Sequence, residues 1–279
     1  MRTPKARALG ESLRAARKER DMTLRDLAKL IECDPGQISR WENGERVPKL
    51  DQVARILTKL DVTGERYDTI VNLAHGTDDG RWIAITPPEQ REQLVALVHF
   101  EQSATAITVV SPLLVPGLLQ TRDYTRAIMT STNLSEAEAS FRVALRMGRQ
   151  DILNRPAPVK LTAYIGEAVF KQRIGTPQTM HEQMRHILNM ATQSNVDVRV
   201  MPFDSGWHPG LETLFVIMES AANPTIVNVE LRAQAMFMHE KHDVAIYREA
   251  LAHVDQIALS PNDSTTLVAE YTDQWRDRV

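Results

Sequence analysis

Apolar residues recur at helical spacing through the first 75 residues of the chain. Leu9, Leu13 and Ala16 share one side of a first helix. The same spacing predicts four further short helices. These cover residues 23–31, 35–43, about 49–60 and 64–74. Five short helices without a strand pattern predict an all-α domain over residues 1–75.

The third of these helices is the most informative. Asp34 is suited to its N-cap, a proline follows at the first helical position, and a glycine suits the stop. Its apolar positions are Ile38 and Trp41, whereas Gln37 and Arg40 lie three residues apart on another face. A polar face on so short a helix, preceded by a second short helix, predicts a helix-turn-helix that enters the major groove of DNA.

Charge is distributed unevenly along the chain. Residues 1–60 contain 14 lysines and arginines against 9 aspartates and glutamates, whereas the whole chain has a net charge of −3. A basic first part on an acidic remainder favours contact with a polyanion at one end. Arg2, Lys5 and Arg7 precede the first predicted helix, either as a mobile arm along the nucleic-acid backbone or as an ordinary frayed terminus.

The pattern changes after residue 75. Residues 75–80 break the helical spacing and two prolines follow shortly, so residues 76–88 are predicted to be a linker. Beyond it, helical and β-branched segments are interspersed, which predicts an α+β domain with a mixed sheet of three to five strands over residues 89–279. The predicted helices are 89–106, 121–129, 135–154, 177–193, 242–258 and 263–276, and the predicted strands are 159–165, 196–201, 214–218 and 226–229.

Length and composition also bear on location. With 279 residues, 43 % of them hydrophobic, the chain is long enough for two domains. It has no run of 18 apolar residues and no signal-peptide pattern, so we expect a cytoplasmic protein without membrane contact, associated with the nucleoid when bound to DNA. A single cysteine, Cys33, excludes an internal disulfide.

Residues 9–60 resemble the lambda-repressor-like, five-helix DNA-binding domain of the xenobiotic-response-element class of bacterial regulators. The resemblance implies that Arg17 pairs with Glu42 and that both residues, with Trp41, are structural. The motifs that carry it are Leu13-Arg14-Ala15-Ala16-Arg17, Met22-Thr23, Leu27-Ala28, Ile38-Ser39-Arg40-Trp41-Glu42-Asn43-Gly44 and Pro48.

The same resemblance implies DNA contacts. Ser39 and Asn43 match positions that touch the sugar-phosphate backbone, and Arg40 matches a position that reads base edges. Leu24 replaces the family's phosphate-binding glutamine, for which Arg25 is a candidate substitute. Since proline and glycine occupy the first positions of the recognition helix, base reading is expected from Gln37 and Arg40.

A second resemblance covers residues 89–271. This part is similar to the domain that follows the helix-turn-helix in actinobacterial antitoxin-like transcriptional regulators. The resemblance implies a regulator that acts at its own or a neighbouring promoter and pairs with a small companion protein. The matching pieces are Phe100-Glu101-Gln102-Ser103-Ala104, Val115 to Thr121 with Asp123-Tyr124, Arg146 to Gln150, Tyr164 to Ala168, Met201-Pro202, Trp207-His208-Pro209-Gly210 and Ala258-Leu259-Ser260.

The second part offers little catalytic chemistry. The spacing of its histidines does not match common metal-site motifs, so we expect no metal, no cofactor and no catalytic residues. Trp207 and His208 either line a pocket for a partner or ligand, or belong to a buried turn anchored by the tryptophan, and the turn is favoured. Met236 and Met238, which flank Phe237, are either an adaptable surface or core residues.

Three functions are compatible with a helix-turn-helix followed by a second domain. The first is a homodimeric, DNA-binding regulator whose second domain responds to a small partner protein or ligand. The second is an enzyme with an attached DNA-binding module, and the third is a protein-binding module. The missing catalytic cluster disfavours the enzyme, and Arg40, Asn43 and the local positive charge disfavour the third. The sequence therefore predicts a regulator that binds operator DNA.

Overall fold

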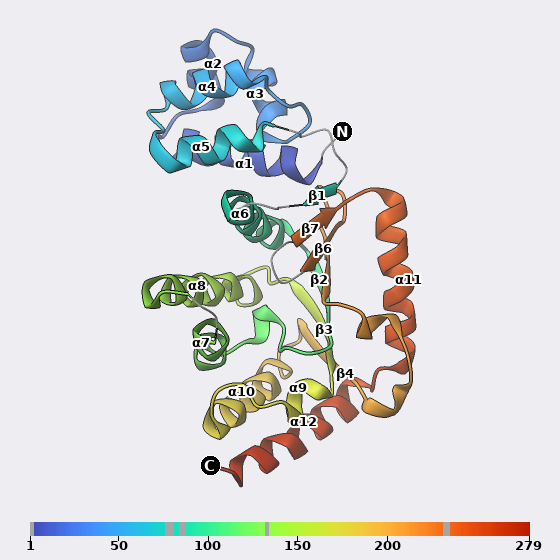
Figure 1. Ribbon diagram of the computed structural model, residues 1–279. Coiled ribbons are helices and arrows are strands. Elements are labelled where there is room, and N and C mark those ends of the chain that lie inside the picture. Colours follow the sequence, from blue (N-terminus) through green and yellow to red (C-terminus); the bar gives the residue numbers. More distant parts are fainter. Residues whose placement is uncertain (1–2, 76–80, 84–86, 132–133, 231–234) are drawn as a thin grey trace. The chain divides into compact units, whose positions relative to one another are not determined.

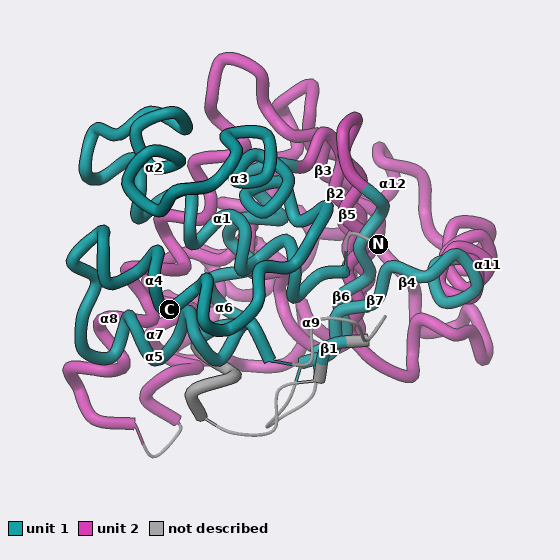
Figure 2. Tube along the Cα trace, turned by 90° about the horizontal axis from the view of Figure 1, so that it is seen from above, with its two compact units in different colours: residues 1–103, 224–244 teal, residues 104–223, 245–279 magenta. Residues whose placement is uncertain are grey.

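The computed structural model describes the chain except for residues 1–2, 76–80, 84–86, 132–133 and 231–234 (Figure 1). Its contacts divide it into two compact units (Figure 2). The first unit comprises residues 1–103 and 224–244, and the second comprises residues 104–223 and 245–279. Each unit therefore combines segments that are distant in the sequence.

The first unit begins with five helices, which confirms the predicted all-α organisation. Their polar caps explain where they begin. Thr3 Oγ1 accepts from Ala6 N at 3.1 Å, Thr23 Oγ1 accepts from Asp26 N at 3.2 Å, and Asp34 accepts from Gln37 N at 3.1 Å. The helices are α1 Pro4–Lys18, α2 Leu24–Ile31, α3 Pro35–Glu42, α4 Leu50–Lys59 and α5 Gly64–Leu73.

Buried apolar side chains from all five helices form one core. Each comes from the apolar stripe of its helix, so periodicity alone located them. They include Leu9, Leu13, Leu27, Ile38, Trp41, Ile56, Leu57 and Leu73, each at most 3 % exposed.

Neither of the two alternatives left open for the N-terminus, a mobile arm or a frayed terminus, holds for Lys5 and Arg7. Both residues lie inside α1, because the Thr3 cap and Pro4 start this helix earlier than the apolar pattern indicated. The guanidinium of Arg7 lies over the ring of Phe100, 4.7 Å from its centroid. Arg2 lies outside the described residues.

The first unit also contains a helix and three antiparallel strands. The helix is α6 Pro87–Ser103, and the strands, in sheet order, are β1 Arg81–Ile83, β7 Ala235–Met238 and β6 Ile226–Glu230. Phe237 is 1 % exposed and packs edge-on against Phe100 with ring centroids 5.2 Å apart. Phe237 and Met238 are thus core residues rather than an adaptable surface.

Only part of the predicted linker lies within the described residues. Of residues 76–88, those at 76–80 and 84–86 lie outside the described residues, whereas 81–83 form β1 and α6 begins at Pro87. The helix-turn-helix, α6 and the strands β1, β6 and β7 belong to one compact unit. A domain boundary at 76–88 stays a prediction.

The second unit is built on a mixed sheet, which confirms the predicted class of fold. Strands β2 Ala106–Ser111, β3 Lys160–Gly166 and β4 Val196–Met201 are parallel, and β5 Phe215–Glu219 pairs antiparallel with β2. Helices α7, α8 and α10 lie on one side of β2, β3 and β4, and α11 lies on the other (Figure 1). The helices are α7 Arg122–Thr130, α8 Glu136–Arg149, α9 Ala168–Lys171, α10 Pro177–Met190, α11 Lys241–Ile257 and α12 Pro261–Arg276, and the 3-10 turns are Gly117–Leu119, Gln150–Leu153, Phe203–Ser205 and Pro209–Leu211.

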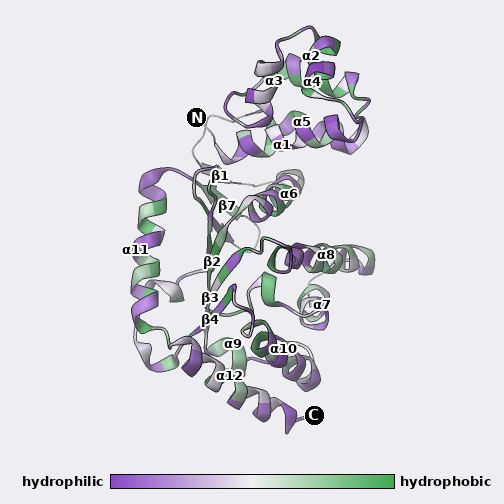
Figure 3. Cartoon of the chain, turned by 180° about the vertical axis from the view of Figure 1, so that it is seen from behind, coloured by the Kyte–Doolittle hydropathy of each residue, from purple (hydrophilic) through white to green (hydrophobic). Residues whose placement is uncertain are grey.

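Strand β2 was not predicted from the sequence, and the helix predicted at 89–106 extends past the end of α6 at Ser103. In β2 the apolar residues Ile107, Val109 and Val110 are all buried and only Thr108 interrupts them, which is typical of a strand covered on both faces. In contrast, α11 alternates hydrophilic and hydrophobic stretches (Figure 3), as expected for a helix covering the sheet on one side.

Candidate nucleic-acid interface

Helix α3 separates its apolar and polar residues cleanly. Ile38 and Trp41 are 1 % and 3 % exposed, so this side of the helix faces the core. On the opposite side, Arg40 and Asn43 are exposed and Gln37 is half-buried. Positions 37, 40 and 43 recur every three residues and therefore form one stripe along the helix. This stripe is available to a ligand outside the five-helix bundle.

The end of α3 is held by two glycines. Gly44 has φ +66°, the left-handed conformation that ends many helices and favours glycine. Gly10 of α1 lies directly against the last turn, because a Cβ there would come within 2.4 Å of Trp41 O and 2.7 Å of Glu42 O. The close approach of the α1 and α3 backbones therefore requires a residue without a side chain at position 10.

Arg17 and Glu42 form the pair that the family resemblance implied. Arg17 donates from Nε to Glu42 Oε1 at 2.6 Å and from Nη2 to Glu42 Oε2 at 2.7 Å, and its Nη1 donates to Met22 O at 2.6 Å. The two side chains are 10 % and 2 % exposed. The hydrogen bonds to Glu42 raise the pKa of Arg17 above its ordinary value. This buried bidentate pair joins α1 to the end of α3.

Arg14 was not among the sequence-predicted site residues. Its Nη2 donates to Asn43 Oδ1, its Nη1 donates to Glu11 Oε2 at 3.1 Å, and its Nε donates to Glu42 Oε2 at 3.4 Å. The Asn43 amide nitrogen lies 3.5 Å from Ser39 Oγ. The structure thus brings Ser39 and Asn43 together and adds Arg14 to them. The signal in the sequence was its position one turn before Arg17 on the same helix.

The side chains predicted to contact DNA differ in their bonding, since Asn43 is bonded to Arg14 whereas three others are unbonded among the described residues. Within the described part of the chain, no hydrogen bond or ion pair of the Gln37, Arg40 or Arg25 side chain is found. Arg25 is exposed on the first turn of α2, beside the Thr23 cap. Arg46 and Lys49, in the connection to α4, are further exposed cations that sequence reasoning did not select. Unpaired cations near a polar helix face suit a polyanionic ligand.

The predicted turn anchored by Trp207 in the second unit is wrong. Trp207 is 75 % exposed, whereas His208 is 3 % exposed. The histidine is enclosed because Gly210 brings the chain close to Val254 and Met201. Burial lowers the pKa of His208. The buried anchor of this turn is the histidine, and the tryptophan points away from the core.

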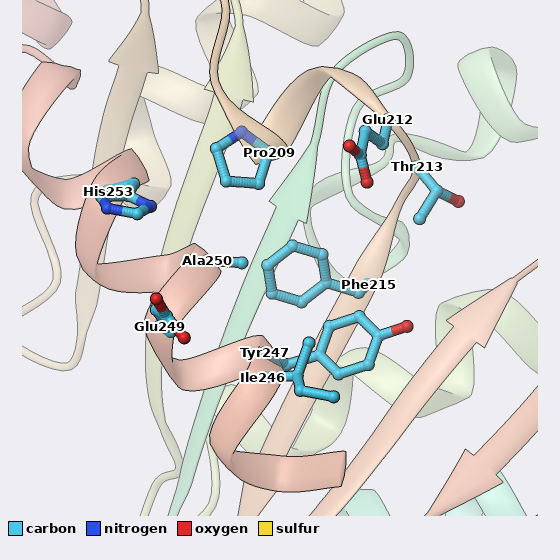
Figure 4. Close-up of a pocket in the computed structure, with 9 residues that line it drawn as sticks. All are labelled: Pro209, Glu212, Thr213, Phe215, Ile246, Tyr247, Glu249, Ala250 and His253. Atoms are coloured by element: carbon cyan, nitrogen blue, oxygen red, sulfur yellow. The ribbon is translucent and has the colours of Figure 1, made fainter.

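A pocket of about 300 Å³ begins just after this turn (Figure 4). Phe215, at 2 % exposed, and Tyr247 pack together with ring centroids 5.1 Å apart. Neither Trp207 nor His208 is among the residues that line the pocket, and their role in partner or ligand binding stays a prediction. The lining residues are Pro209, Glu212, Thr213, Phe215, Ile246, Tyr247, Glu249, Ala250 and His253.

Two further properties of the described residues concern metal ions and membranes. Their histidine, cysteine, aspartate and glutamate side chains contain no group of three or more placed to hold a metal ion. Their helices include none that is both long and apolar enough to span a bilayer.

Two family models match separate parts of the chain. The family model described as a Helix-turn-helix domain matches residues 8–69. The model described as Domain of unknown function (DUF5753) matches residues 94–270, which is more than half of the chain. No curated protein matches the chain significantly. The first match covers α3 and its supporting residues and indicates a DNA-binding regulator.

Proposed function

The chain belongs to the family of the Domain of unknown function (DUF5753), and from this, together with its helix-turn-helix, we propose that it is a sequence-specific transcriptional repressor. The exposed stripe of Gln37, Arg40 and Asn43 on α3 carries the proposal. It combines groups able to bind base edges with a helix short enough for the major groove.

The proposed contacts follow from the chemistry of each side chain. Arg40 donates two hydrogen bonds to a guanine, and Gln37 donates to and accepts from an adenine. Each such pair is worth roughly 1–3 kcal/mol of discrimination between bases. Ser39, Asn43 and Arg25 contact the sugar-phosphate backbone and set the position of α3 in the groove.

We further propose the class and the assembly. The first five helices form a lambda-repressor-like domain of the xenobiotic-response-element class, and the protein is antitoxin-like. It acts as a homodimer, so that two copies of α3 reach half-sites about 34 Å apart on one face of the duplex. A small companion protein or a ligand regulates it through the second part of the chain.

The test of DNA recognition begins with the full-length protein and a random duplex library. Repeated selection should yield one enriched motif, bound with an affinity that falls steeply as salt rises. In Arg40→Ala, binding to that motif should weaken by about tenfold to a hundredfold, with little change on random DNA.

Arg66→Ala is the matched control. It also removes one positive charge from the five-helix bundle, but its guanidinium is bonded to Glu19, with Nη2 to Oε1 at 2.9 Å. This exposed pair contributes little to stability. A chain that selects no motif, or an Arg40→Ala variant that discriminates as well as the control, would contradict the proposal.

Assembly needs separate measurements. Sedimentation of the full-length protein with its selected duplex should give two protein chains per duplex. Co-expression with each neighbouring small open reading frame should give one stable complex with altered operator affinity. Binding of a single chain to a single half-site would contradict the dimer.

A further inference from the structure

The proposed function places Ser39 and Asn43 against the sugar-phosphate backbone, and we propose that Arg14 is the positioning residue that turns the Asn43 amide nitrogen toward one phosphate in this subsite. The inference rests on the proposed function and specifies its chemistry at the end of α3. The ligand group is an unesterified oxygen of a phosphodiester.

The orientation of the amide follows from the donors and acceptors around it. Arginine has only donors, so the atom of Asn43 that faces Arg14 Nη2 must be the oxygen. The amide nitrogen therefore points away from Arg14, toward the side on which Ser39 Oγ lies at 3.5 Å. Asn43 is an exposed residue, and its amide nitrogen has two hydrogens, of which the contact to Ser39 uses only one.

This orientation decides whether a phosphate is attracted or repelled. Phosphodiester oxygens only accept hydrogen bonds, so the amide nitrogen binds them and the amide oxygen repels them. An amide free to rotate by 180° presents either atom, and binding must then select one. Arg14 removes that choice before DNA arrives. The hydroxyl of Ser39 is a second donor on the same side.

The charge of Arg14 is already engaged within the protein. Its Nη1 is 3.1 Å from Glu11 and its Nε is 3.4 Å from Glu42, and its side chain is 29 % exposed. A guanidinium surrounded by two carboxylates and an amide oxygen is poorly placed to neutralise a phosphate as well. We therefore expect Arg14 to act through Asn43 and not by direct contact.

The variants needed for a test should fold. Glu42 keeps both of its short hydrogen bonds from Arg17 when Arg14 is replaced. Glu11 is 32 % exposed and loses only a partly exposed partner. Asn43 ends α3 through its backbone amide, which donates to Ser39 O at 3.0 Å and does not depend on the side chain.

The experiment measures the dissociation constant for the selected operator duplex at several KCl concentrations. It uses the full-length protein and the variants Arg14→Ala, Arg14→Lys, Asn43→Ala and the double alanine variant. Loss of a hydrogen bond to a charged phosphate should weaken binding about tenfold in Asn43→Ala. Arg14→Ala should lose about threefold to tenfold, and Arg14→Lys, which keeps one donor, should recover part of that loss.

Two readouts separate positioning from direct contact or general destabilisation. In the Asn43→Ala background, Arg14→Ala should cause no further loss, because it has nothing left to orient. The slope of log affinity against log salt should equal that of the wild type in every variant. A direct phosphate contact by Arg14 would instead reduce the slope by about 0.9.

The outcomes distinguish this inference from the proposed function. If the wild type shows no salt-dependent binding, the proposed function is wrong and the subsite falls with it. If the wild type binds but the two alanine losses multiply, or the Arg14→Ala slope decreases, the subsite alone is overturned. A loss in Arg14→Ala that tracks a lowered melting temperature, without rescue by lysine, also overturns it.

Discussion

The buried pair between Arg17 and Glu42 permits the sharpest stability prediction. Glu42→Ala removes a carboxylate that is 2 % exposed and that accepts two short hydrogen bonds from Arg17. The guanidinium left behind is 10 % exposed and keeps Met22 O as an acceptor. The positive charge of Arg17 would then lack an anionic partner and would still be shielded from water, which is unfavourable.

The magnitude follows from that burial. Breaking a buried ion pair by removing one partner costs about 3–5 kcal/mol. Domains of this size are stable by only about 5–15 kcal/mol, so Glu42→Ala should remove a large part of the stability of the five-helix bundle. In terms of the unfolding equilibrium, this is a shift of between about a hundredfold and several thousandfold.

Native-state hydrogen exchange is the suitable assay, because a chain with two compact units need not unfold in one step. Amides of α1 and α3 should exchange faster in Glu42→Ala by the predicted factor. Glu19→Ala is the matched control, since it breaks a glutamate–arginine pair whose side chains are 58 % and 45 % exposed. Exposed pairs contribute about 0–1 kcal/mol, so the control should change exchange little.

A third variant tests the physical reason. Arg17→Met combined with Glu42→Leu replaces both charges by apolar groups and should restore most of the stability, because no charge remains buried alone. The reasoning would be refuted if Glu42→Ala cost no more than Glu19→Ala. It would also be refuted if the double replacement were as unstable as the single one.

Two further predictions concern close packing and burial. Gly10→Ala places a Cβ within 2.4 Å of Trp41 O, so α1 and α3 must separate. Thermal unfolding should show a destabilisation of about 1–3 kcal/mol. Gly148→Ala is the control, because its Cβ meets nothing within 4 Å and should be neutral or slightly stabilising. A destabilisation that is equal for both glycines would contradict the packing argument. Burial raises the pKa of Tyr124 to about 12, above its ordinary value near 10. Its contribution to the free energy of unfolding is therefore complete below pH 10 and is lost as the pH rises toward 12, because only the unfolded state ionises in that range. Urea unfolding at pH 9 to 11 should therefore show a smaller loss of stability in Tyr124→Phe than in the wild type, and equal losses would count against the assignment.

Candidate site residues that lie near each other in the sequence were predictable from it. Contacts between residues on different helices were only partly predictable. Gln37 and Arg40 were identified because helical spacing puts them on one face. The Arg17–Glu42 pair required the family resemblance, because its members are 25 residues apart. Arg14 was not selected, since only the packing of α1 against α3 brings it to Asn43.

The sequence by itself determined the five helices and the polar face of Gln37 and Arg40 on α3, because caps, apolar spacing and helix stops are signals within one helix. Tertiary structure decided the rest. It placed β2 as a buried strand, enclosed His208 while exposing Trp207, and grouped α6 with the helix-turn-helix. These outcomes depend on which surfaces cover a segment, and burial between distant segments leaves no periodic trace in either of them.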